Sequence, residues 1–200
     1  MGKGRIEAFS DGVIAILITI MVLEMKVPEG VSIRDLIPVI PVFLSYVLSF
    51  LYLGIYWNNH HHMLHTVEKV TGGMLWANLH LLFWLSLIPF VTHWMNVNHF
   101  SRVPTAFYGF VLFMSAVAYS ILQGRIIASQ GAGSILKLAI GKDWKGKISP
   151  IFYLLAILLA IEETRWAALA LYVFVAIIWL IPDRRIENVL KTLERKEKGG

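Results

Sequence analysis

Six stretches of mostly apolar residues follow one another along the chain, separated by short segments rich in glycine, proline and charged residues. They are Ile6–Met25, Leu36–Trp57 with a helical continuation to His65, Met74–Trp94, Pro104–Ile127, Ile148–Ile161 and Trp166–Ile181. A helix needs about 20 mostly apolar residues to cross the hydrocarbon core of a bilayer. The pattern therefore predicts an all-α polytopic membrane protein with six transmembrane helices, of which the fifth is short.

Capping residues and prolines mark several boundaries of these stretches. Ser32 and Asp35 have the spacing of a capping box just before the second stretch. Pro41 is expected to bend the second helix and Pro89 to kink the third, because proline removes a backbone donor and clashes with the preceding turn.

The composition agrees with a membrane protein, since 57% of the residues are hydrophobic and only 16% are charged. The chain has no cysteine, which excludes disulfides and thiolate metal sites. We find no P-loop, dinucleotide fingerprint or nucleophile elbow, so an enzyme is not expected. With no internal repeat, residues 1–182 are expected to form the membrane domain and residues 183–200 a basic amphipathic cytoplasmic tail.

The positive charges divide unequally between the two sides that six spans define. Of the 18 Lys and Arg, 14 lie on the side of the termini and of the connections after the second and fourth spans. The remaining four are Lys26, Arg34, Arg102 and Arg165. The positive-inside rule therefore places both termini in the cytoplasm. Orientation accounts for the basic charge, and no nucleic-acid partner is expected.

Asp11 is a charged residue about six positions inside the first apolar stretch, where carboxylates are usually paired or functional. Trp57 and His61 share a helical face at the end of the second stretch, and Asn78 begins the third. All of them lie at the same predicted depth. We therefore expect a polar network between the first three helices. Its members are Ser10, Asp11, Trp57, His61 and Asn78.

The histidine-rich segment HHHMLH, residues 60–65, has alternative interpretations. Histidine-rich runs bind metals or sense pH. However, adjacent histidines point to different faces of a helix, and Glu68 is the only nearby acid in the sequence. A structural role in the network is therefore favoured, and no metal site is expected.

An aliphatic stripe runs along the first helix at a position turned away from Asp11. At about 100° per residue, Ile16, Ile20 and Leu23 lie on one line, and Ile16 is about 140° from Asp11. Thr19 lies near the edge of the stripe. Periodicity alone indicates contact of this stripe with lipid or with the protein core.

The residues Arg5-x-x-x-Phe9-Ser10-Asp11 resemble the R-x-x-x-F-S-D signature of the transmembrane protein 175 family of potassium channels. The segments YWNNHH and NLHLLFWLSLIPF and the six-span pattern also resemble the bacterial members of that family. The resemblance implies a homotetramer in a prokaryotic inner membrane, with a pore lined by the first helix of each subunit. It further implies a constriction formed by Ile16, Ile20 and Leu23, with Thr19 as a polar pore-lining residue.

The resemblance also gives the four signature residues a role, in which they hold the first helix through contacts with the second and third helices. The resulting hypothesis is a passive, potassium-permeable cation channel that is closed by rings of aliphatic side chains and requires no cofactor. Selectivity for potassium is expected to be weaker than that of a filter made of backbone carbonyls. The alternatives are a proton-coupled transporter that uses Asp11 and the histidines, and a membrane enzyme with a histidine-based metal site.

Overall fold

The structure is a computed structural model that describes residues 2–141, 143–162 and 164–180, in which the regular elements are helices. The α-helices are α1 (Lys3–Leu23), α2 (Ile40–His65), α3 (Gly72–Ser86), α4 (Ile88–Val97), α5 (Arg102–Gln130), α6 (Ile135–Ile140), α7 (Trp144–Ile161) and α8 (Arg165–Leu180). Two 3-10 helices, η1 (Ile33–Val39) and η2 (Gly131–Gly133), lie in the connections.

Five helical segments of the described chain are long and apolar enough to cross a membrane, which confirms the first five predicted spans. They are α1, η1 with α2, α3 with α4, α5, and α7. Helix α8 corresponds to the sixth predicted span and has 16 residues, fewer than the roughly 20 of a typical spanning helix. The tail predicted for residues 183–200 lies outside the described residues.

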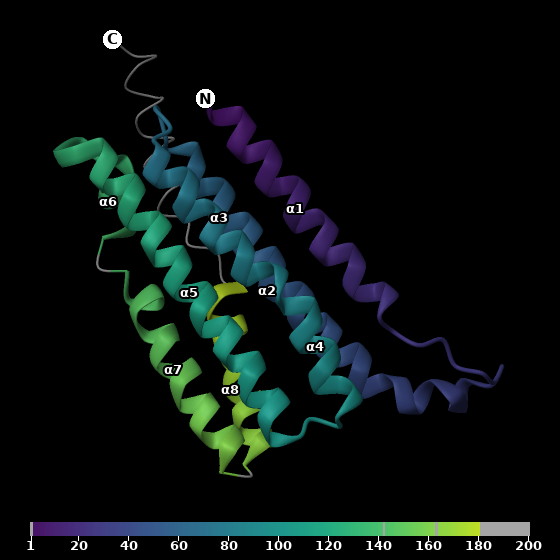
Figure 1. The fold of residues 1–200 in the computed structure, drawn as a ribbon. Coiled ribbons are helices and arrows are strands. Elements are labelled where there is room, and N and C mark those ends of the chain that lie inside the picture. Colours follow the sequence, from purple (N-terminus) through teal and green to yellow (C-terminus); the bar gives the residue numbers. More distant parts are fainter. Residues whose placement is uncertain (1, 142, 163, 181–200) are drawn as a thin grey trace.

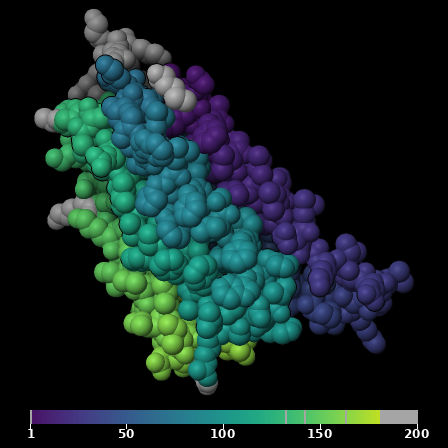
Figure 2. Space-filling view, in the orientation of Figure 1, coloured from purple at the N-terminus to yellow at the C-terminus, as the bar shows by residue number. Residues whose placement is uncertain are grey.

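The spanning helices alternate in direction, so that successive turns lie at opposite ends of the bundle (Figure 1). The start of α1, the α2–α3 turn and α6 lie at what we call the N-terminal end. The segment after α1, the α4–α5 turn and the α7–α8 turn lie at the far end, where η1 and the residues before it protrude from the body (Figure 2). Helix α1 forms one edge of the bundle and packs on α2, α3 and α4, whereas α7 and α8 pack on α5 at the opposite edge.

The predicted boundary residues mark helix limits as expected, with two refinements. The capping box of Ser32 and Asp35 is present, and its Asp35 carboxylate accepts a hydrogen bond of 2.8 Å from the Ser32 backbone N–H. Pro41 lies in the first turn of α2, so the chain changes direction between η1 and α2 instead of within α2. Pro89 lies in the first turn of α4, and the expected kink is a break between α3 and α4.

Buried hydroxyl groups connect the helices through the centre of the bundle. Thr92 donates to the carbonyl oxygen of Ile88 within α4, and its oxygen lies 2.8 Å from the hydroxyl of Ser49 on α2. The hydroxyl of Tyr108 on α5 lies 3.1 Å from Ser49. These contacts form one chain of hydrogen bonds from α5 through α2 to α4. In lipid, such bonds and close packing hold helices together, because the lipid tails are as apolar as the helix surfaces.

Replacement of Gly109 by alanine is expected to destabilise the bundle by about 1–3 kcal/mol, the usual cost of overpacking. A Cβ atom on Gly109 would overlap the hydroxyl of Tyr172 on α8 and come 3.0 Å from Cγ1 of Ile157 on α7. The measurement is thermal unfolding of the purified protein in detergent. Gly124→Ala, on the same helix but with nothing within 4 Å of the added Cβ, is the matched control and should be neutral or stabilising. Equal melting of the two variants would contradict this close approach.

Candidate functional site on the first helix

Helix α1 has one face buried against the rest of the bundle. The buried residues recur at helical spacing, and they are Ile6, Ser10, Ile14, Leu17 and Met21. The repeat of three and four residues is that of a single stripe on an α-helix. One side of α1 is therefore committed to α2, α3 and α4, and the other side is left uncovered by its own subunit.

The uncovered side carries the aliphatic stripe predicted from the sequence. Ile16 is 57% exposed, Ile20 is 40% exposed and Leu23 is 79% exposed. Phe9, seven residues before Ile16, is also exposed and continues the stripe toward the N-terminal end. So much apolar surface on one helix indicates contact with lipid or with other protein copies.

Thr19 lies beside the stripe, and its hydroxyl hydrogen is used within the helix. Its Oγ1 is 2.9 Å from the carbonyl oxygen of Ile16 and 3.1 Å from that of Ala15. Because the hydroxyl donates to its own helix, its lone pairs remain as acceptors on the exposed side of α1. An oxygen acceptor among aliphatic side chains is suited to contact a cation or a water molecule.

A buried polar network fixes α1 to α2 and α3. Ser10 donates to the carbonyl oxygen of Ile6 over 2.8 Å, so its oxygen accepts from Nδ2 of Asn78 on α3 over 2.9 Å. The amide of Asn78 therefore presents Oδ1 to His60 on α2, and His60 Nε2 donates to it over 2.7 Å. The carbonyl oxygen of Ile6 thus determines which atom donates in each hydrogen bond of the series from Ser10 through Asn78 to His60.

Asp11 forms a separate contact at the edge of this network. Its carboxylate accepts a hydrogen bond of 3.0 Å from Nε1 of Trp57 on α2. One residue beyond Ser10 is about 100° further around the helix, which brings Asp11 from the buried face to a half-buried edge. Asp11 therefore joins α1 to α2 near the surface of the subunit, while Ser10 joins α1 to α3 in the interior.

The structure places His60, and not the predicted His61, on Asn78. His61 is exposed and stacks on Trp57, with the ring centroids 6.3 Å apart. The shared face of Trp57 and His61 is present as predicted, but it points outward. A one-residue offset rotates a side chain by about 100°, so neighbouring histidines cannot enter the same interior. Within the described ranges, no three His, Cys, Asp or Glu residues are arranged to hold a metal ion.

The four signature residues thus lie in different environments. Ser10 is buried, Asp11 is half-buried, and Arg5 and Phe9 are exposed. Only Ser10 and Asp11 have hydrogen bonds to other helices described above, so contact of all four with the second and third helices stays a prediction.

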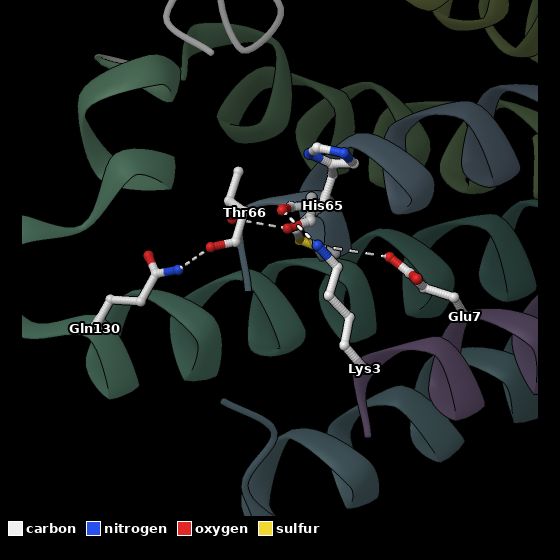
Figure 3. Close-up of polar contacts among 6 residues, drawn as sticks. Lys3, Glu7, His65, Thr66 and Gln130 are labelled. Carbon is white, nitrogen blue, oxygen red and sulfur yellow. Dashed lines mark hydrogen bonds and ion pairs between the residues drawn. The ribbon is translucent and has the colours of Figure 1, made fainter. Parts of the chain in front are cut away.

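Two further contacts that the sequence did not indicate hold the N-terminal end of α1 and the end of α2 (Figure 3). Lys3 Nζ donates to the carbonyl oxygen of His65 over 2.7 Å and lies 4.0 Å from Oε1 of Glu7. Gln130, at the end of α5, donates from Nε2 to the carbonyl oxygen of Thr66. Carbonyls at a helix C-terminus lack partners within the helix. Helices α1 and α5 supply these partners, and no local sequence pattern indicates a bond from a side chain to the backbone of a distant helix.

A third unpredicted contact lies at the far end of α1. Glu24 follows the last residue of α1, and its Oε2 is 3.2 Å from Nδ1 of His93 on α4. The two side chains are 48% and 38% exposed, respectively. The sequence indicated only that Glu24 and His93 lie near the same end of their predicted spans.

The chain is similar to a family of channels and to individual proteins named as potassium channels. The model of the family described as "Endosomal/lysosomal potassium channel TMEM175" matches residues 5–89. A potassium channel of Chryseobacterium sp. (strain P1-3) is 58% identical over 191 residues, which cover 96% of this chain and 99% of that protein. A potassium channel of Streptomyces collinus is 35% identical over 128 residues, covering 60% of this chain and 62% of that one.

The fold also matches a solved structure, the crystal structure of a lysosomal potassium-selective channel TMEM175 homolog from Chamaesiphon minutus. The TM-score is 0.79 at 27% identity, over 90% of this chain and 97% of that chain. The residues matched by the family model contain the exposed stripe of α1 and the network of Ser10, Asn78 and His60.

Proposed function

Because the chain belongs to the TMEM175 family of potassium channels, as one of its bacterial members, we propose that it is a passive, potassium-permeable cation channel. Its pore is lined by α1 of each subunit in a homotetramer in a prokaryotic inner membrane. The naming of its relatives as channels gives no support to the proton-coupled transporter or the membrane enzyme.

The observation that carries this proposal is the exposed stripe of Ile16, Ile20 and Leu23 at the edge of the subunit. One subunit supplies only one wall of a path along these side chains. Copies arranged around an axis beside α1 complete the path and bring equivalent residues together as rings. A narrow ring of aliphatic side chains excludes water from the pore and thereby blocks ions.

The buried network gives the stripe its orientation within this assembly. Ile16 lies six residues after Ser10, which is about 120° around the helix. With Ser10 held against Asn78, rotation of α1 about its own axis breaks an interior hydrogen bond. Opening of the pore therefore proceeds by tilting or separation of the α1 helices more readily than by their free rotation.

The described charges support an orientation with the N-terminal end in the cytoplasm. Seven described Lys and Arg belong to that end, and four belong to the far end. Those of the N-terminal end are Lys3, Arg5, Lys69, Arg125, Lys137, Lys145 and Lys147. The positive-inside rule assigns the more basic end to the cytoplasm.

Reconstituted protein is expected to carry potassium and also a measurable sodium current in planar bilayers, with potassium favoured. An aliphatic ring replaces little of an ion's hydration shell. Potassium loses its water more easily than sodium and therefore passes more readily, but sodium is not excluded. Reversal potentials under bi-ionic conditions measure the ratio. Strict exclusion of sodium would contradict the hydrophobic constriction, and uptake that requires a proton gradient would contradict passive conduction.

A further inference from the structure

The contact between Glu24 and His93 joins the end of α1 to the middle of α4. Its 3.2 Å distance between Oε2 and Nδ1 is that of an ion pair when the histidine is protonated. Both side chains remain partly exposed. Neither residue has a role in the constriction or in the buried network described above.

Glu24 lies at the edge of the buried face of α1, on the side that meets α4, about 80° around the helix from Ile16. Its backbone is still helical, with φ −76° and ψ −11°. Four residues after Ile20, it lies about 40° around the helix from that side chain. Glu24 therefore stands at the border between the stripe and the buried face, where its side chain remains 48% exposed.

We propose that Glu24 supplies the negative charge that attracts potassium to the outer mouth of the pore, and that His93 cancels this charge when it takes up a proton. This inference rests on the proposed function, because a fourfold assembly brings four Glu24 carboxylates around the mouth. Charge of one sign at a narrow opening raises the local concentration of counter-ions. Rings of acidic side chains are used in this way by cation channels.

The direction of the pH effect follows from the charges of the pair. Histidine is the side chain whose charge ordinarily changes between about pH 5 and 8. With His93 neutral, the carboxylate of Glu24 acts on ions unopposed. With His93 protonated, its positive charge lies beside the carboxylate and offsets it. Acidification on the far side of the membrane is therefore expected to lower the conductance.

The pH effect on conductance is assigned to His93 because the polar side chains beside the pair are neutral. The hollow beside it is lined by Tyr46 of α2 and by the neutral side chains of Thr92 and Asn96 of α4. The remaining charged or titratable side chains of the far end are Lys26, Glu29, Arg34, Asp35, His99, Arg102, Glu162 and Arg165 in the described residues. His99 is the other histidine among them, and its exposed side chain makes it a matched control.

The test is single-channel conductance in planar bilayers at low and high potassium chloride. Glu24→Gln is expected to lower the conductance severalfold at about 0.01 M salt and little at about 1 M, where the Debye length has fallen from about 30 to about 3 Å. His93→Asn should retain the high conductance and lose its dependence on outer pH. His99→Asn should respond to pH like the wild type.

Wild-type protein tests the inference without any substitution. Acidification of the outer side should lower the low-salt conductance toward that of Glu24→Gln, because a protonated His93 places a positive charge beside the carboxylate. Unchanged low-salt conductance in Glu24→Gln would overturn the role of Glu24 and leave the channel itself intact. A retained pH response in His93→Asn would overturn the role of His93. Absence of current in wild type would overturn the proposed function.

Discussion

Potassium leak through the reconstituted protein is expected to rise when Ile16 is replaced by asparagine. Ile16 is an exposed member of the α1 stripe, and four copies would form one aliphatic ring of the closed pore. A polar side chain at this position holds water in the ring and removes the barrier that dewetting creates. A rise of about tenfold corresponds to a barrier lowered by about 1.4 kcal/mol. Liposomes loaded with potassium, with efflux followed by an ion-selective electrode, measure this change.

Two variants separate the ring from other effects of the substitution. Ile16→Val keeps the position apolar and should leave the leak close to that of the wild type. Val22→Asn places the same polar group on an exposed position, about 120° around α1 from Ile16, and should not raise the leak. Equal leak in Val22→Asn and Ile16→Asn would show that any polar group on α1 disturbs the protein. That outcome would contradict a specific constriction at Ile16.

Loss of the Asn78 side chain is expected to destabilise the protein by about 1–3 kcal/mol in an Asn78→Ala variant. Asn78 is buried and joins α3 to Ser10 on α1 and to His60 on α2. The substitution removes both hydrogen bonds and leaves a buried donor on His60 without its partner. Because the network also holds the rotation of α1, the variant should weaken the proposed tetramer along with stability. Thermal unfolding in detergent and size-exclusion chromatography measure the two effects.

Asn59→Ala is the matched control for this variant. Asn59 is a half-buried residue of α2 whose amide donates to the carbonyl oxygen of Ile55 in its own helix. Its loss removes a local bond and should cost much less. Asp11→Ala is expected to fall between the two, because the Asp11–Trp57 bond joins α1 to α2 at a half-exposed edge. Asn78→Ala that melts like Asn59→Ala would contradict the anchoring role of the network.

The depth of the polar network was predictable from the sequence, but the rotation of its helices was not. Depth along each predicted span placed Ser10, Asp11, Trp57 and Asn78 in one layer, and the structure joins them in two contacts. Depth follows from counting residues at about 1.5 Å each. Rotation about the α2 axis does not follow from depth, and it decided that His60 enters the interior while His61 stacks on Trp57 at the surface.

The sequence by itself determined the presence of the first five spans, the capping box at Ser32, an interruption at Pro89 and the stripe on α1. These features depend on local backbone geometry and on the length needed to cross a bilayer, and both can be read from the spacing of residues in the sequence. Only the tertiary structure decided which histidine binds Asn78, and that Lys3 caps α2 while Glu24 meets His93. Those contacts depend on how neighbouring helices rotate and approach one another, and they include backbone atoms that are the same in every residue.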